Sequence, residues 1–161
     1  MLPIKDKSFD SWIIGYGNPQ RRDDGIGPYV IDRLNTILGY KKEIHILSLH
    51  QLEPDLIEEL RYANLLIFVD AATGQVEGGW RWVKVQSELR DLHYVTHHFK
   101  PSFLLGLLQS IYHHCPRTWL VSVQGDDFEF GEGLTSGAEK RARMVVSEIV
   151  RFILTRINRK E

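Results

Sequence analysis

Cysteine is almost absent from this sequence: Cys115 is the single cysteine among 161 residues. The chain therefore forms no disulfide within itself, which is compatible with a reducing compartment. Cys115 follows two histidines and precedes Pro116, between an apolar stretch typical of a helix and another typical of a strand. This position predicts a turn and favours a structural role for Cys115 over a catalytic or metal-binding one.

Neither sign of charge is in excess, and no apolar run is long. Lys and Arg number 20 and Asp and Glu number 21, which gives a formal net charge of −1. Bulk charge therefore gives no reason to expect a nucleic-acid or membrane partner. A membrane span needs ~20 apolar residues, and the first ten residues carry charges where a secretory signal is apolar. We expect a soluble, cytoplasmic protein.

One local excess of positive charge lies at the C-terminal end, at Arg151, Arg156, Arg159 and Lys160. These residues fall at the end of a predicted helix. Cations there interact favourably with the negative end of the helix dipole, and this is how we interpret them.

A phosphate-binding loop is also missing. Gly15 and Gly17 resemble the start of a dinucleotide loop, but Gln20 stands where the third glycine is needed. Asp23 and Asp24 then occupy the predicted start of a helix, where their charge would repel a phosphate. There is no usable Ser-His-Asp order and no catalytic-cysteine signature, which argues against nucleophilic catalysis.

The order of apolar patterns predicts one α/β domain over residues 1–161, because strands and helices alternate. The fold class is a three-layer α/β/α sandwich, with a mixed, mostly parallel sheet of about five strands and helices on both faces. Strands are predicted at 11–16, 43–49, 64–69, 80–85 and 118–123, and helices at 25–38, 54–60, 101–112 and 136–157. Asp23 or Asp24 is the candidate cap of the first helix, and Ser136 with Glu139 forms a candidate capping box for the last.

Three polar clusters stand where strands end, which is where ligands collect in open α/β sheets. They are Asp23–Asp24, then Asp70 after a Leu-Leu-Ile-Phe-Val run, and His97–His98 before an apolar helix. One of the first two aspartates suffices as a helix cap, and Asp70 could instead bond local backbone N–H groups. Adjacent histidines point to opposite sides of an extended segment, so one of them at most faces a site. Two carboxylates and one imidazole would suit a divalent transition ion better than a structural zinc.

The sequence also resembles a known family, the [NiFe]-hydrogenase maturation endopeptidases, over about residues 11–150. Five stretches carry the resemblance in order: Gly15-x-Gly17-Asn18-Pro19-x-x-x-Asp23-Asp24-Gly25-x-Gly27-x-x-Val30, His50-Gln51-Leu52-x-Pro54-x-Leu56, Phe68-Val69-Asp70-Ala71, Thr96-His97-His98-Phe99-x-Pro101-x-x-Leu104-Leu105 and Gly125-x-x-Phe128-x-x-Gly131-x-x-Leu134-Thr135. Each match alone is weak, but five in order are specific.

The resemblance implies an endopeptidase that removes the C-terminal extension of a [NiFe]-hydrogenase large-subunit precursor after nickel insertion. The nickel is carried by the substrate, and the family's metal contacts map onto Asp24, Asp70 and His97. Asp24 and Asp70 are also the catalytic candidates. His98 and Asp23 remain alternatives at two of these positions, and nickel could act as a recognition tether or as a Lewis acid. The protein is expected to be a monomer when free. The second functional hypothesis is a nickel-recognising accessory protein of hydrogenase assembly that does not cleave.

Overall fold

The computed structural model describes residues 10–89 and 99–159. Within these ranges, the strands are β1 (Ser11–Tyr16), β2 (Ile44–Leu49), β3 (Leu65–Ala72), β4 (Trp80–Lys84) and β5 (Arg117–Gln124). The α-helices are α1 (Ile26–Leu38), α2 (Ile57–Leu60), α3 (Pro101–Tyr112) and α4 (Ser136–Asn158), and short 3-10 turns η1 (Arg22–Gly25) and η2 (Pro54–Leu56) precede α1 and α2. Every predicted strand and helix is confirmed, with ends shifted by a few residues at most. The turn predicted around Cys115 lies between α3 and β5.

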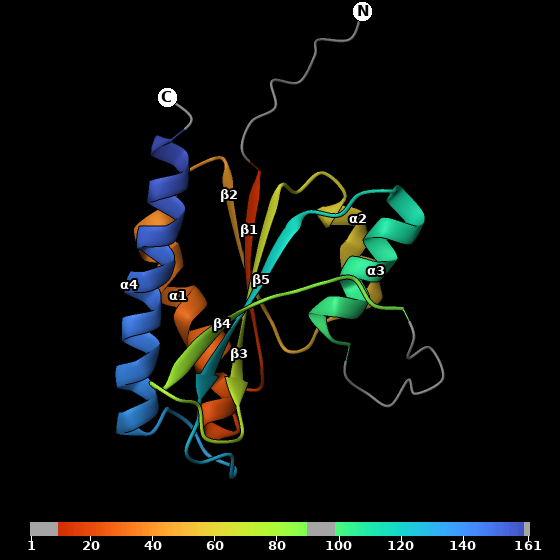
Figure 1. Ribbon diagram of the computed structural model, residues 1–161. Coiled ribbons are helices and arrows are strands. Elements are labelled where there is room, and N and C mark those ends of the chain that lie inside the picture. The colour runs from red at the N-terminus through yellow and green to blue at the C-terminus, as the bar shows by residue number, and fades with distance from the viewer. Residues whose placement is uncertain (1–9, 90–98, 160–161) are drawn as a thin grey trace, which may run out of the picture.

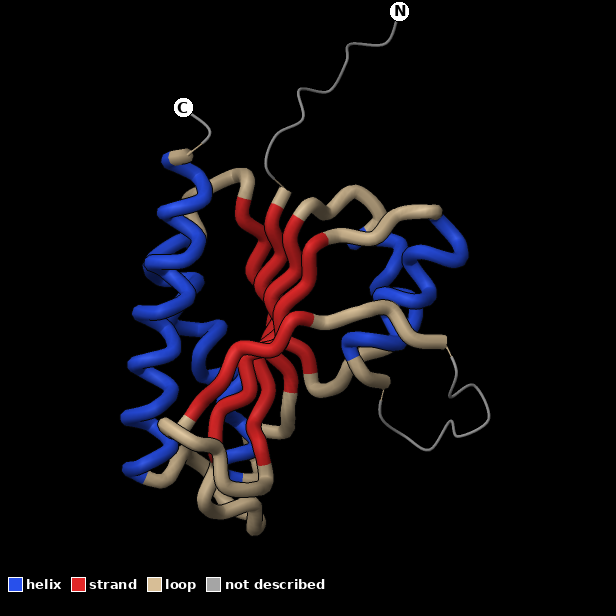
Figure 2. Tube along the Cα trace, in the orientation of Figure 1, coloured by secondary structure: helices blue, strands red, loops and turns tan. Residues whose placement is uncertain are grey.

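The five strands form one sheet in the order β2-β1-β3-β5-β4. Neighbouring strands run parallel from β2 to β5, and β4 pairs antiparallel with β5. Figure 1 shows α1 and α4 on one side of the sheet and α2 and α3 on the other. This arrangement confirms the three-layer fold with a mixed, mostly parallel sheet. Because β2, β1, β3 and β5 run parallel, their carboxyl ends lie at one edge of the sheet, and the loops that follow them gather there (Figure 1 and Figure 2).

The alternation of side chains along the strands divides the core into two clusters, one on each face. Ile13, Ile67 and Val69 face α1 and α4 and are fully buried there. Ile14 and Phe68 face α2 and α3 and are fully buried as well. Because both faces are covered, the central strands read as unbroken apolar runs in the sequence.

One glycine allows the first helix to lie directly against the sheet. A Cβ atom on Gly27 would stand 2.5 Å from the carbonyl oxygen of Tyr16 and 2.9 Å from that of Val69. Both distances are shorter than a carbon atom tolerates, so α1 can approach the ends of β1 and β3 this closely only with glycine at this position. The consequence is that η1, just before α1, lies beside the end of β3.

Both predicted helix caps are wrong. Gly25 precedes α1 with no side-chain cap, because the Asp23 carboxylate bonds a distant loop instead. Thr135, not Ser136, caps α4, and its hydroxyl accepts a hydrogen bond from the backbone N–H of Ala138. Glu139 makes no capping box, since its carboxylate accepts hydrogen bonds from the hydroxyl of Tyr29 at 3.0 Å and from Arg143 at 2.9 Å.

No helix in the described part of the chain is both long and apolar enough to cross a membrane.

Candidate functional site

Tyr16 and Asp70 lie side by side at the edge where the parallel strands end. In the register of β1 and β3, Gly15 pairs with Val69, so the next residues along the two strands are Tyr16 and Asp70. Tyr16 packs with the cluster on the α2 and α3 face. Asp70 is two residues beyond Phe68, so its side chain points to that same face. The sequence predicted Asp70 just after its strand, but β3 continues through Asp70 to Ala72.

The surroundings of Asp70 disfavour its charge. Burial, and to a lesser extent the nearby negative charge of Asp24, raise the pKa of Asp70 to about 6, although hydrogen bonds from the Tyr16 hydroxyl and the Ala71 backbone N–H oppose the rise. The pKa of Tyr16 is raised as well, first by burial and then by its contact with Asp70. Tyr16 therefore remains a neutral hydrogen-bond donor to Asp70 over the physiological pH range.

The turn η1 places Asp24 near Asp70. It is half-buried, and its Oδ2 accepts a hydrogen bond of 2.7 Å from the backbone N–H of Asn18. Gly17, with φ of +145°, lets the loop after β1 fold back on this turn, because a Cβ at that position would collide with the carbonyl oxygen of Asp24. Two carboxylates from distant parts of the sequence therefore converge at one edge of the sheet.

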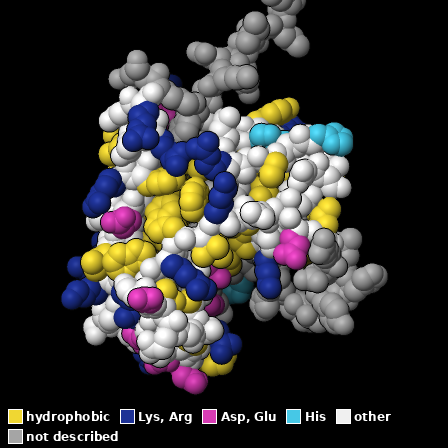
Figure 3. Space-filling view, in the orientation of Figure 1, with side chains coloured by type: hydrophobic (Ala, Val, Ile, Leu, Met, Phe, Trp, Pro, Cys, Tyr) yellow, Lys and Arg dark blue, Asp and Glu magenta, His cyan; other side chains and the backbone are white. Residues whose placement is uncertain are grey.

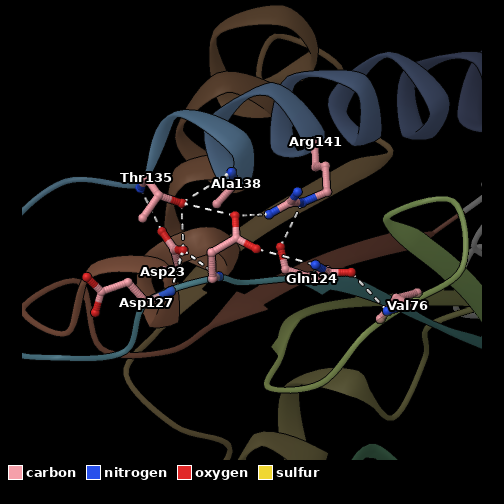
Figure 4. A network of polar contacts seen from close by, with 8 residues as sticks. Asp23, Val76, Gln124, Asp127, Thr135, Ala138 and Arg141 are labelled. Atoms are coloured by element: carbon pink, nitrogen blue, oxygen red, sulfur yellow. Dashed lines mark hydrogen bonds and ion pairs between the residues drawn. The ribbon is translucent and has the colours of Figure 1, made fainter.

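The neighbouring Asp23 serves a different purpose. Its side chain is fully buried and accepts hydrogen bonds from the backbone N–H groups of Asp126, Asp127 and Thr135, at 2.7, 3.0 and 2.8 Å, and from the Thr135 hydroxyl at 2.8 Å. Burial alone would raise its pKa, but these hydrogen bonds outweigh it, and the pKa of Asp23 lies below its usual value. Figure 4 shows this carboxylate at the centre of the loop that joins β5 to α4. Asp23 is a structural anchor, and its bonds leave it little capacity for a ligand.

The same network extends along the loop to β5. Arg141 of α4 donates to the backbone carbonyl of Gln124 at 2.9 Å and to the carboxylate of Asp126 at 2.5 Å. The Gln124 side chain in turn accepts from the backbone N–H of Val76 at 2.9 Å (Figure 4). Sequence reasoning missed these contacts. The signal available was that Asp23 and Thr135 both belong to stretches that carry the family resemblance, and the structure joins them.

Of the predicted metal ligands, the structure brings Asp24 and Asp70 together. His97 and its alternative His98 lie outside the described residues, so the third ligand stays a prediction. Across residues 10–89 and 99–159, no group of three or more His, Cys, Asp or Glu side chains is arranged to hold a metal ion. The pair that is described offers two oxygen donors of like charge, which a divalent cation would stabilise.

The α/β/α sandwich of this chain also occurs in known proteins. No family model matches the chain. A curated protein of Methanocaldococcus jannaschii, provisionally named a hydrogenase maturation protease, is 26% identical over 137 residues, which cover 71% of this chain and 80% of that protein.

Solved structures of hydrogenase maturation proteases have a similar fold. The hydrogenase maturating endopeptidase HybD of Escherichia coli superposes with a TM-score of 0.72 at 19% identity, covering 91% of this chain and 93% of that one. The [NiFe] hydrogenase maturation protease HycI of Thermococcus kodakarensis gives a TM-score of 0.70 at 19% identity, covering 89% and 91%. The chain therefore has the fold of the hydrogenase maturation proteases, and the resemblance indicated by its sequence motifs is confirmed.

Proposed function

We propose that this protein is an endopeptidase that removes the C-terminal extension of a [NiFe]-hydrogenase large-subunit precursor after nickel has been inserted. The single observation that carries the proposal is the convergence of Asp24 and Asp70 at the carboxyl edge of the sheet, where burial and the charge of Asp24 raise the pKa of Asp70. The names of the relatives and of the similar solved structures support the reaction class.

In this proposal the nickel ion belongs to the substrate, and the protease recognises it. Carboxylate oxygens are suitable donors for a divalent transition ion with open coordination positions. The half-buried position of Asp70 and the adjacent charge of Asp24 favour a bound cation, because it would relieve both the desolvation and the repulsion. Asp23 is excluded from this role by its saturated hydrogen bonding.

His97 is proposed as the third contact to the nickel. Phe99, two residues further on, is half-buried in the cluster that also contains Tyr16, and its ring centre lies 5.3 Å from that of Phe103 in α3. His97 itself lies outside the described residues, so this contact rests on the sequence resemblance.

The chemistry assigned to the chain itself is positioning and proton transfer. Asp70 is the better candidate for a general base, because a pKa of about 6 leaves it ionised near pH 7.5 while making it a stronger base than an ordinary aspartate. The Tyr16 hydroxyl holds the Asp70 carboxylate in place through a hydrogen bond. Nickel bound to the substrate would place one peptide bond next to this carboxylate, which lowers the entropic cost of the reaction.

The experiment is to incubate the purified protein with the large-subunit precursor in its nickel-free and nickel-loaded forms and to follow the mass of the precursor. Cleavage of the nickel-loaded form alone supports the proposal. Equal cleavage of both forms contradicts nickel recognition. If the protein binds the precursor only when nickel is present and cleaves neither form, it is instead a non-catalytic accessory protein of hydrogenase assembly.

A further inference from the structure

A concave aromatic surface lies between β4 and the C-terminal half of α4. It is a hollow of about 450 Å³. Its floor is made by three half-buried rings, Trp82 of β4, Trp119 of β5 and Phe152 of α4, with the centre of the Trp82 ring 4.9 Å from that of Phe152 and 6.1 Å from that of Trp119. Figure 3 shows hydrophobic side chains gathered on this side of the molecule, with Lys and Arg side chains around them.

The rim of this hollow is strongly cationic. A second hollow of about 880 Å³ adjoins it, and Arg156 lines both. The cations that line the two hollows are Lys84, Arg117, Arg151, Arg156 and Arg159, and the only carboxylate among the lining residues is Glu148. We call this combined surface the cationic groove.

Among the described residues, most of these cations have no acidic partner. Arg151 lies 3.6 Å from Glu148. In the described part of the chain, Lys84, Arg117, Arg156 and Arg159 form no ion pair with a carboxylate. Burial, followed by the charges of Arg117 and Arg159, lowers the pKa of Arg156, so the neighbouring guanidinium groups disfavour the charge of Arg156. Arg156 is further held against the aromatic floor, with its guanidinium 4.2 Å from the centre of the Phe152 ring.

The fold itself accounts for only part of this charge. Arg156 lies in the last turn of α4, where the helix dipole favours a cation, as the sequence predicted. Lys84 ends an edge strand, where a lysine discourages pairing with other chains. Neither reason applies to Arg117, which begins the interior strand β5. Three elements thus contribute cations to one groove within a chain of net charge −1.

We propose that the cationic groove binds an acidic segment of a partner protein, whose carboxylates meet the arginines and whose apolar side chains cover the Trp82–Phe152 floor. Arginine and aromatic side chains are enriched in protein interfaces. The excess of positive charge in the groove favours a partner segment that carries carboxylates. The groove is formed at the beginning of β5 and the end of α4, whereas Asp24 and Asp70 lie at the opposite end of the parallel strands (Figure 1). A partner can therefore occupy the groove while the acidic edge is free, and the inference does not depend on the proposed protease activity.

The test uses the full chain and a fluorescent synthetic peptide of alternating Glu and Phe, with a matched peptide of alternating Lys and Phe. Binding is followed by fluorescence anisotropy at low and high salt. The variant R156Q/R159Q removes two groove cations, and K42Q/K140Q removes two exposed cations elsewhere. We expect the Glu peptide to bind, R156Q/R159Q to weaken it about tenfold, and K42Q/K140Q to change it less than about twofold. A second variant, Trp82→Leu, tests the aromatic floor and should also weaken binding.

Other results would overturn the inference. Equal losses in R156Q/R159Q and K42Q/K140Q would indicate nonspecific attraction. Failure of the Glu peptide to bind, or equal binding of the Lys peptide, would exclude an acidic segment. Tighter binding of a single-stranded oligonucleotide at the same salt would point to nucleic acid. Self-association in analytical ultracentrifugation that R156Q/R159Q abolishes would identify a second copy of this chain as the occupant. Circular dichroism of each variant checks that the fold is retained.

Discussion

Asp23 and Asp24 are consecutive residues of one short turn, but their carboxylates have different surroundings. The Asp23 carboxylate is buried and accepts hydrogen bonds from the loop between β5 and α4, which hold its pKa low. Asp24 accepts one hydrogen bond from the backbone N–H of Asn18, and its charge contributes to the raised pKa of Asp70. A carboxylate whose oxygens accept several hydrogen bonds, as those of Asp23 do, stabilises the fold. A carboxylate that has few hydrogen-bond donors and lies near a second carboxylate, as Asp24 does, is suited to bind a cation.

The largest effect is expected from removing the charge of Asp70. Asp70→Asn keeps the shape of the side chain but removes the proposed base, so cleavage of the nickel-loaded precursor should fall by about 10²- to 10⁴-fold. Mass spectrometry of the precursor measures the rate. Asp55→Asn, at an exposed carboxylate of η2, is the matched control and should cleave at the wild-type rate. Wild-type activity in Asp70→Asn would exclude Asp70 from catalysis.

Asp23 should matter most for stability. Asp23→Ala leaves the N–H groups of Asp126, Asp127 and Thr135 without their acceptor, which should lower the free energy of unfolding by about 3 kcal/mol or more. Asp24→Ala removes the acceptor of one backbone N–H group, that of Asn18, and should cost less than half as much. Urea denaturation compares the two variants. Equal losses of stability would contradict the distinction between the anchor and the ligand candidate.

The two regions should also respond to pH with opposite signs. The pKa of Asp70 is raised to about 6, so its ionisation destabilises the fold as the pH rises from about 4 through 6. Asp70→Asn should therefore become more stable than the wild type over this range, by about 3 kcal/mol at pH 8. The pKa of Asp23 is lowered, so its stabilising contribution is present above the ordinary aspartate pKa and is lost as the pH falls through its folded-state pKa.

Unfolding curves of Asp70→Asn, Asp23→Asn and the wild type between about pH 2 and pH 8 measure both effects on stability. The cost of Asp23→Asn should be greatest near neutral pH, whereas the gain from Asp70→Asn should vanish in acid. A gain from Asp70→Asn that is independent of pH would show that the Asp70 charge is already compensated.

The smallest predicted effect concerns Tyr16. Its hydroxyl opposes the rise in the pKa of Asp70, so Tyr16→Phe should raise that pKa further. A carboxylate titration followed by NMR detects the shift, and Tyr112→Phe, on the far end of α3, serves as the control. A fall in the pKa of Asp70 in Tyr16→Phe would mean that the hydroxyl does not donate to the carboxylate.

Much of the fold could be predicted from the sequence because it depends on local patterns. The run from Leu65 to Val69 is apolar throughout since both faces of β3 are covered, and the apolar spacing of α1 follows its buried side. The role of Asp23 could not be predicted in this way. Its donors lie more than one hundred residues away, so a short-range pattern showed only a charged residue at a helix start and suggested a cap.

The candidate site shows the same limit. The positions of Asp24 and Asp70 followed from the rule that loops after parallel strands meet at one edge. The motif resemblance favours Asp24 over Asp23 as the ligand candidate, and the different hydrogen bonds of the two carboxylates are visible only in the structure. The sequence pattern indicates only a helix end for Arg151, Arg156 and Arg159. The tertiary structure alone brings Arg117 and Lys84 next to Arg156.

The central claim is that Asp24 and Asp70 form one site while Asp23 belongs to another. The most direct test is the pKa of Asp70, measured by NMR in the wild type, in Asp24→Asn and in the control Asp55→Asn. The pKa should start at about 6 and fall part of the way towards 3.8 in Asp24→Asn, with no change in the control. An Asp70 pKa that is the same in Asp24→Asn as in the wild type would contradict the claim.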